Sequence, residues 1–279
     1  MPKPARADAG ALPSVQANLT FNADLTEPSY LYAYEPPPGA TATNMVSDVQ
    51  SVPVHSARSI ADQLSLDVEG IAVVRHRSAV RDFWDEPQTL ALGHPEAAQL
   101  VKDITGASRV VVFDHTLRRV TGPASPSSNG PRSAAVRIHV DQTVASGPQR
   151  VRDIMGDQAE ALLKRRAAII NVWRPIAHEA RDWPLAAADA SSIDPNDLIP
   201  TALVFPNRRG EIYNLRHNPA QRWLYIPDLR PDEAILIKCW DSDTSVAQFT
   251  PHAGFEDPST PPGTPPRESI EFRTIAFFD

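Results

Sequence analysis

Two residues near the middle of the chain have the types and spacing of a metal-binding pair. His139 and Asp141 end the strand-like segment AAVRIHVD, with Val140 between them. Side chains two apart in a strand project from the same face, so the imidazole and the carboxylate could bind one ion. The alternative is a hydrogen-bonded pair on the surface. Taken alone, the spacing does not decide between the two.

A third ligand has to come from elsewhere in the chain. His252, in the segment FTPHAGFEDP after an apolar strand, is the candidate, although the chain has 8 histidines in all. Two histidines and one carboxylate on one face of an ion leave its other positions open for reactants. The same ligand set also suits the Zn(II) of a hydrolase. The alternative for His252 is a histidine in a structural loop.

The C-terminal segment predicts an anion-binding face. In a strand, Arg267, Ser269, Glu271 and Arg273 project from one side. A planar guanidinium beside a hydroxyl suits a carboxylate, through paired charge-assisted hydrogen bonds. The alternative is an Arg-Glu-Arg ladder of ion pairs on a solvent-exposed face.

Proline shapes the elements that must position these residues. The chain has 28 prolines in 279 residues and only 12 glycines; this is about twice the usual proline share of roughly 5% and favours short strands over helices. Helical periodicity is confined to 59–66, 95–104 and 148–166, the last interrupted at Gly156. Strand-like runs occur at 70–75, 109–114, 135–140, 168–173, 185–190, 201–205, 221–226, 234–240 and 269–278. We expect a mainly β fold, a double-stranded β-helix or jelly roll with a few flanking helices.

The N-terminal segment and the amino-acid composition limit the class of protein. We expect a disordered N-terminal tail over residues 1–17 and a single domain over 18–279. One cysteine allows no internal disulfide. A net charge of −7 argues against nucleic acid or an anionic membrane as partner. Without a long apolar run or a signal peptide, we expect a cytoplasmic protein with a small-molecule substrate. The oligomeric state stays open, a homodimer included.

From residue 70 to the C-terminus, about three quarters of the chain, several sequence blocks occur in a recognisable order. They are VFDHTLRR from Val112, IHVDQT from Ile138, NVWRPI from Asn171, PLAAADA from Pro184, HNPAQRWLYIPDLRPDEAILIKCWDS from His217, FTPHAGFEDP from Phe249 and RESIEFR from Arg267. With them the chain resembles the hydroxylase/desaturase family of secondary metabolism typified by CmcJ and AsaB, a branch of the Fe(II)/2-oxoglutarate-dependent oxygenases. One departure is the gap of 111 residues between Asp141 and His252, which is long for the wider class.

The resemblance implies roles for particular residues. It implies that His139, Asp141 and His252 bind Fe(II), that Arg267 with Ser269 binds 2-oxoglutarate, and that Arg273 is the rival for that carboxylate. Further residues in family blocks are expected to line the substrate pocket: His115, Arg118, Asn171, Trp173 and Arg174. For Trp173, a place in the hydrophobic core is an equal alternative.

The resemblance also implies an activity. An enzyme of this family uses Fe(II), 2-oxoglutarate and O2 to oxidise an unactivated C–H bond of a secondary-metabolite precursor, such as an amino acid or peptide. Hydroxylation, desaturation and oxidative cyclisation are all compatible with the sequence. The alternatives are a non-catalytic β-sandwich binding protein and a zinc hydrolase that uses the same two histidines and aspartate.

Overall fold

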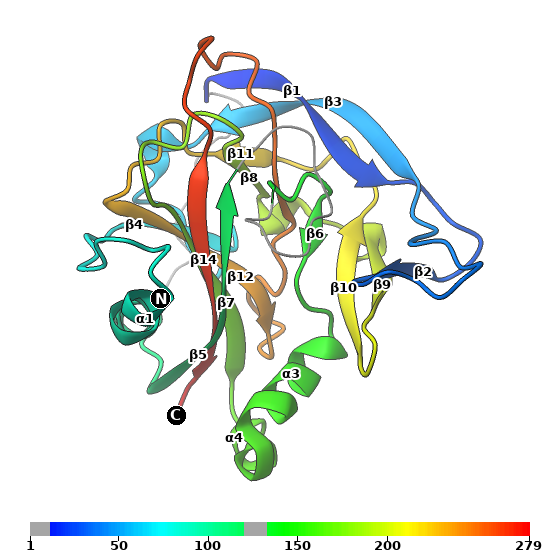
Figure 1. The fold of residues 1–279 in the computed structure, drawn as a ribbon, viewed down its shortest axis with the longest axis vertical. Helices are drawn as coiled ribbons and strands as arrows, with labels where there is room; N and C mark the ends of the chain where they lie inside the picture. The colour runs from blue at the N-terminus through cyan, green and yellow to red at the C-terminus, as the bar shows by residue number, and fades with distance from the viewer. Residues whose placement is uncertain (1–11, 120–132) are drawn as a thin grey trace.

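Two β-sheets packed face to face make up most of the molecule (Figure 1). The computed structural model describes residues 12–119 and 133–279. The larger sheet has, in spatial order, β1 (Ser14–Asn22), β3 (Ser47–Ser56), β11 (Trp223–Tyr225), β8 (Leu185–Ala188), β13 (His252–Gly254), β6 (His139–Val140), β10 (Arg209–Leu215), β9 (Leu198–Val204) and β2 (Ser29–Tyr32). The smaller sheet has β4 (Ile71–Arg75), β12 (Glu233–Asp241), β7 (Ala167–Pro175), β14 (Glu268–Phe277) and β5 (Arg109–Arg119). Apart from β9 and β10, which form a hairpin, neighbouring strands are not consecutive in the chain, as in a jelly roll.

The five-stranded sheet separates two hydrophobic cores. Along β7, every residue is buried, and alternate side chains enter different cores. Ile169 and Trp173 pack between the sheets, whereas Ile170 and Val172 pack on the outer face, under α2 (His94–Thr105). This explains why β7 reads as a continuous apolar run instead of an alternating one.

The helices are short and peripheral. They are α1 (Glu86–Gln88), the π-helical turn Thr89–Gly93, α2, α3 (Ser146–Met155) and α4 (Ala159–Leu162). Single 3-10 turns cover Arg58–Ile60, Gly156–Gln158, Ala190–Ser192 and Pro195–Asp197. As the sequence predicts, Gly156 separates α3 from α4; its φ of +53° is a conformation that favours glycine. Both helices lie at one end of the molecule (Figure 1). None of the helices in the described ranges is long and apolar enough to cross a membrane.

The predicted mainly β, jelly-roll class is confirmed, but some elements differ. The helix expected over 59–66 is wrong: only one 3-10 turn forms there. The disordered tail expected over 1–17 is wrong for residues 14–17, because Ser14 begins β1; residues 1–11 lie outside the described residues. The strand expected over 135–140 shortens to β6. Five strands were not expected: β1, β2, β3, β10 and β13.

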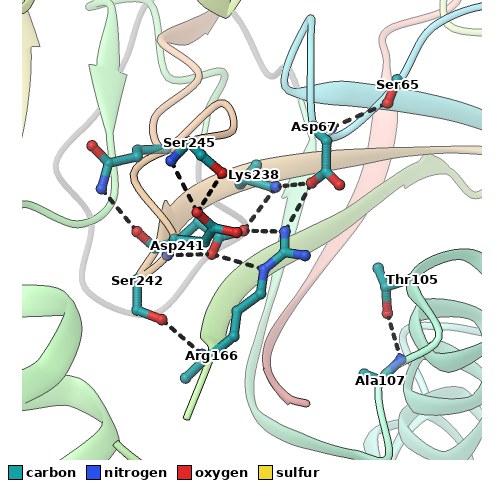
Figure 2. A network of polar contacts seen from close by, with 12 residues as sticks. Ser65, Asp67, Thr105, Ala107, Arg166, Lys238, Asp241, Ser242 and Ser245 are labelled. Atoms are coloured by element: carbon teal, nitrogen blue, oxygen red, sulfur yellow. Dashed lines mark hydrogen bonds and ion pairs between the residues drawn. The ribbon is translucent and has the colours of Figure 1, made fainter. Parts of the chain in front are cut away.

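A buried ion cluster lies at the outer face of the five-stranded sheet (Figure 2). Lys238 of β12 is 1% exposed and donates to Asp67 at 2.5 Å and to the fully buried Asp241 at 2.8 Å. Arg166 donates to the same two carboxylates. Two cations thus face two anions, and the cluster is neutral. The residue after Lys238, Cys239, belongs to the core between the sheets, so the cluster and that core lie on different faces.

Candidate active site

The two candidate histidines stand side by side on neighbouring strands. His139 in β6 and His252 in β13 are direct partners in the antiparallel ladder, and their ring centroids are 4.7 Å apart. Asp141 follows β6, and its Oδ1 lies 3.6 Å from Nε2 of His139. The strand pairing therefore brings together three residues that span 113 positions of the chain.

Backbone carbonyl groups fix the orientation of both imidazoles. Nδ1 of His139 lies 2.9 Å from the carbonyl oxygen of Arg137, and Nδ1 of His252 lies 2.9 Å from that of Thr250. A carbonyl oxygen only accepts hydrogen bonds, so each Nδ1 carries the proton and donates. Each Nε2 is then left with a lone pair, which is the form that binds a metal ion.

The charges at the site favour the metal-binding protonation states. Burial, together with the nearby His252, lowers the pKa of His139 to about 4. Burial by itself would raise the pKa of Asp141, but the positive charge of Arg273 and the two imidazoles hold it far below its usual range. At neutral pH the imidazole of His139 is neutral and the carboxylate of Asp141 is ionised, as ligands must be.

Arg273 and Asn171 of the opposite sheet hold the carboxylate of Asp141. The Nε of Arg273 donates to Oδ2 of Asp141 at 3.0 Å, and Nδ2 of Asn171 donates to the same oxygen at 2.9 Å. We call these two residues the Asp141 clamp. The remaining guanidinium donors of Arg273 bond to Asp114, Thr116 and Glu271. Arg273 is therefore committed to protein partners.

The donor types fit Fe(II), since two neutral imidazoles and one carboxylate make a facial ligand set with open positions. In the part of the chain that the structure describes, no three His, Cys, Asp or Glu side chains already converge as a metal-binding group. Convergence of His139, Asp141 and His252 on one ion therefore requires their side chains to move.

Arg267, which shares a small cavity with the two histidines, and Ser269, two positions further along the chain, both have buried polar atoms. Arg267 is 2% exposed and Ser269 is 1% exposed. Nη1 of Arg267 donates to the carbonyl oxygen of Trp183. Within the described residues, neither Nε of Arg267 nor Oγ of Ser269 has a hydrogen-bond partner. Burial and the neighbouring Arg118 lower the pKa of Arg267 to about 10. An anion would satisfy these atoms.

A small cavity connects Arg267 to the imidazoles. Its lining includes Arg267, His139, His252, Trp173 and Gly254. A Cβ atom added to Gly254 would lie 3.4 Å from Nη1 of Arg267 and 3.1 Å from Cβ of Ala134. Glycine at this position therefore leaves room next to the guanidinium.

The chain was compared with known proteins. The profile of a family described as "Oxidoreductase/YMDC permease-like domain" matches residues 19–277. The Fe(II)/2-oxoglutarate-dependent dioxygenase nvfI of Aspergillus novofumigatus is 30% identical over 259 residues, which cover 90% of this chain and 92% of that protein. The hydroxylase/desaturase asaB of Aspergillus flavus is 40% identical over 160 residues, covering 50% of this chain and 70% of the relative. The chain belongs to the hydroxylase/desaturase family of Fe(II)/2-oxoglutarate-dependent oxygenases.

Solved structures agree with this membership. The iron and alpha-ketoglutarate-dependent endoperoxidase NvfI superimposes with a TM-score of 0.87 at 27% identity, covering 95% of this chain and 98% of that one. The predicted enzyme class, with Fe(II), 2-oxoglutarate and O2 as its requirements and a small molecule as its substrate, is confirmed by these relatives. The non-catalytic and zinc-hydrolase alternatives lose their support.

The family-block residues divide between two faces of the five-stranded sheet. Arg118 and Trp173 line the small cavity, and Asn171 bonds to Asp141. His115 and Arg174 lie on the outer face and are not brought to the site. His115 contacts His94 at 3.0 Å, and Arg174 bonds to His76. Strand alternation separates them, because each is an odd number of positions from a residue that faces the site.

Sequence reasoning did not foresee the partners of Arg273 on β5. Asp114 is the ladder partner of Arg273, and Thr116 lies two positions further on. Their signal was present in the alternation of VFDHTLRR, where Asp114, Thr116 and Arg118 share one face. Glu271, considered only as a member of a surface ladder, lines the small cavity and is 7% exposed.

Proposed function

We propose that His139, Asp141 and His252 hold the Fe(II) of this oxygenase and that Arg267 with Ser269 binds the distal carboxylate of 2-oxoglutarate. The observation that carries this proposal is the unsatisfied buried Nε of Arg267, in one small cavity with both imidazoles. The unsatisfied Oγ of Ser269 lies two positions further along the chain, on the same face of the strand. An enclosed guanidinium without a carboxylate partner is costly unless a ligand supplies one. Bound Fe(II), 2-oxoglutarate and O2 supply the oxidation of a substrate C–H bond.

The chain's own residues bind and orient these groups. The carbonyl oxygens of Arg137 and Thr250 hold the imidazoles with Nε2 toward the metal site. The Asp141 clamp donates two hydrogen bonds to Oδ2 of Asp141 and leaves Oδ1 facing the metal site. Trp173, whose ring centroid lies 5.4 Å from the guanidinium carbon of Arg267, supplies an apolar wall of the cosubstrate cavity.

Arg267 is a better candidate than Arg273 for the cosubstrate carboxylate. Arg273 already contacts three carboxylates, those of Asp141, Asp114 and Glu271. Releasing it would leave these negative charges without their cation. We therefore propose a structural role for Arg273 and a cosubstrate role for Arg267. The substrate is a small precursor of secondary metabolism, oxidised by hydroxylation, desaturation or cyclisation.

Iron content and succinate release test the ligand assignment. The protein is loaded with Fe(II) and 2-oxoglutarate without oxygen, oxygen is admitted, and succinate is measured. We expect His139→Ala and His252→Ala to lose both iron and succinate formation. His217→Ala is the matched control, because His217 packs edge-on against Phe21 and should keep both. Full iron occupancy in either ligand variant would overturn the assignment.

The cosubstrate assignment has its own test. Arg267→Ala should raise the apparent KM for 2-oxoglutarate far more than Arg273→Ala does, whereas Arg273→Ala should chiefly weaken metal binding. If Arg273→Ala gives the larger increase in KM, the cosubstrate is held by Arg273 instead.

A further inference from the structure

A second cavity opens next to Asp141 and is distinct from the one that contains Arg267. Its enclosed part has a volume of about 60 Å³, and the whole space with its open mouth about 400 Å³; Asp141 belongs to its wall. Arg150 of α3 and Arg208 of the turn between β9 and β10 also line it, as do the apolar side chains Leu203, Phe205 and Ile212. Arg209, the residue after Arg208, lines it as well, so the cavity combines apolar walls with three guanidinium groups.

The two arginines lack anionic partners. Within the described residues, neither Arg150 nor Arg208 makes an ion pair or a side-chain hydrogen bond; Arg150 lies over the ring of Phe113 at 5.6 Å and Arg208 over that of Phe205 at 3.7 Å. Ten of the other arginines in the described residues form ion pairs with carboxylates, among them Arg152 and Arg273. Burial and the charge of Arg208 lower the pKa of Arg150, while Asp153 and Asp114 act in the opposite direction.

The acidic side chains of the same wall are already engaged. Asp141 accepts from the Asp141 clamp, Glu211 accepts from Oγ1 of Thr143 at 2.5 Å, and Asp153 accepts from Nε2 of Gln149 at 2.8 Å. An anion placed between Arg150 and Arg208 would relieve the repulsion between the two cations. The planar guanidinium presents paired donors that match the two oxygens of a carboxylate.

We propose that this cavity binds the substrate, and that Arg150 and Arg208 recognise a carboxylate on it. The inference rests on the proposed function, since Asp141 marks the metal side of the cavity. The substrate is then an organic acid whose apolar part packs against Leu203, Phe205 and Ile212. The carboxylate at the arginines leaves the rest of the molecule to extend toward Asp141.

A matched pair of probes tests this inference. The full chain, loaded with Mn(II) and saturated with 2-oxoglutarate, is titrated with 4-phenylbutyrate and with 4-phenylbutyramide, and proton relaxation by Mn(II) reports whether the probe binds near the metal. We expect the acid to bind about tenfold more tightly than the amide, as for a hydrogen bond to a charged group. Arg150→Gln combined with Arg208→Gln should abolish the preference, and Arg150→Lys should keep part of it.

The control comes from the same helix. Arg152 pairs with Glu160 on the surface and is outside the cavity, so Arg152→Gln should leave the preference unchanged. Absence of a carboxylate preference in the unmodified protein overturns the proposal, whether both probes bind equally or neither binds. A preference that survives the double variant also overturns it, as does a loss of 2-oxoglutarate binding in Arg150→Gln.

A failure of the proposed metal-ligand assignment would give a different result from a failure of the proposed carboxylate site. If Mn(II) binding, followed by its electron spin resonance, is insensitive to His139→Ala, then the ligand assignment is wrong. The acid–amide comparison, repeated by calorimetry on metal-free protein, still decides whether the arginines select a carboxylate.

Discussion

Arg273 donates from its Nε to Oδ2 of Asp141 at 3.0 Å, across the space between the two sheets. Arg273 lies on β14 of the five-stranded sheet, and its ladder partner on β7 is Asn171, which bonds to the same oxygen. Oδ1 is left toward His139. One sheet thus offers the candidate ligands, and the other determines which oxygen of the carboxylate faces them.

Removing the charged half of the Asp141 clamp should weaken metal binding. We expect Arg273→Gln to lower the affinity for Mn(II) or Fe(II) by about 10–100-fold, the usual cost of losing a partner of a ligand. The measurement is competition with a chelator. Arg267→Gln is the control, because it should impair 2-oxoglutarate binding and leave the metal affinity nearly unchanged. An unaltered metal affinity in Arg273→Gln would contradict the role of the clamp.

The metal-free protein should lose stability in acid because of His139. Its pKa is about 4 in the folded chain, against an ordinary value of 6.5, so the unfolded chain binds more protons between these pH values. The free energy of unfolding should therefore fall as the pH decreases from 6.5 to 4, by about 3 kcal/mol from this residue. Urea unfolding at several pH values measures the slope. His139→Gln should flatten it, and an identical slope in that variant would refute the assignment.

The buried ion cluster of Figure 2 should be sensitive to a single neutral substitution. Asp241→Asn removes the buried anion beside Lys238. Only the half-exposed Asp67 then compensates the charge of Lys238, and Arg166 competes for the same carboxylate. We expect a loss of about 3 kcal/mol in the free energy of unfolding. Asp232→Asn, at an exposed pair with Arg230, is the control and should change little. Equal stability of the two variants would show that the cluster is dispensable.

Gly147 at the start of α3 should tolerate no side chain. An added Cβ atom would lie 2.5 Å from two ring atoms of Trp240. We expect Gly147→Ala to cost about 1–3 kcal/mol, as overpacking does. Gly210→Ala is the comparison, because its nearest neighbour would be Leu203 at 3.7 Å. Thermal unfolding of the two variants decides; a silent Gly147→Ala would mean that α3 can shift away from the sheet.

The sequence indicated much of the candidate site because strand alternation is local. The spacing of His139 and Asp141, and the shared face of Ser269, Glu271 and Arg273, follow from a period of two. The same rule could not tell which face of β5 or β7 points to the site, because both faces are covered. His115 and Arg174, expected in the pocket because they belong to family blocks, lie on the outer face of the sheet.

The sequence could not predict which residues far apart in the chain lie close together in the fold, for a different reason. Arg150 and Arg208 come from a helix and a turn 58 positions apart, and no local pattern connects them. The strands β1 and β3 were not predicted. In β1 the signal was present, because Val15, Ala17, Leu19 and Phe21 alternate with polar residues, but the expected disordered tail covered part of the segment. In β3 the alternation is interrupted by Pro53. Their place in the sheet depends on pairing with each other, which only the folded chain reveals.

The strands that carry the two histidines are very short: β6 has two residues and β13 has three. Few ladder hydrogen bonds connect such strands, so most of their cohesion has to come from side chains. A shared ion would act as a cross-strand link that the backbone does not provide. Loss of the metal should then appear as faster amide hydrogen exchange around His139 and His252, through local opening of the sheet, while the five-stranded sheet keeps its protection.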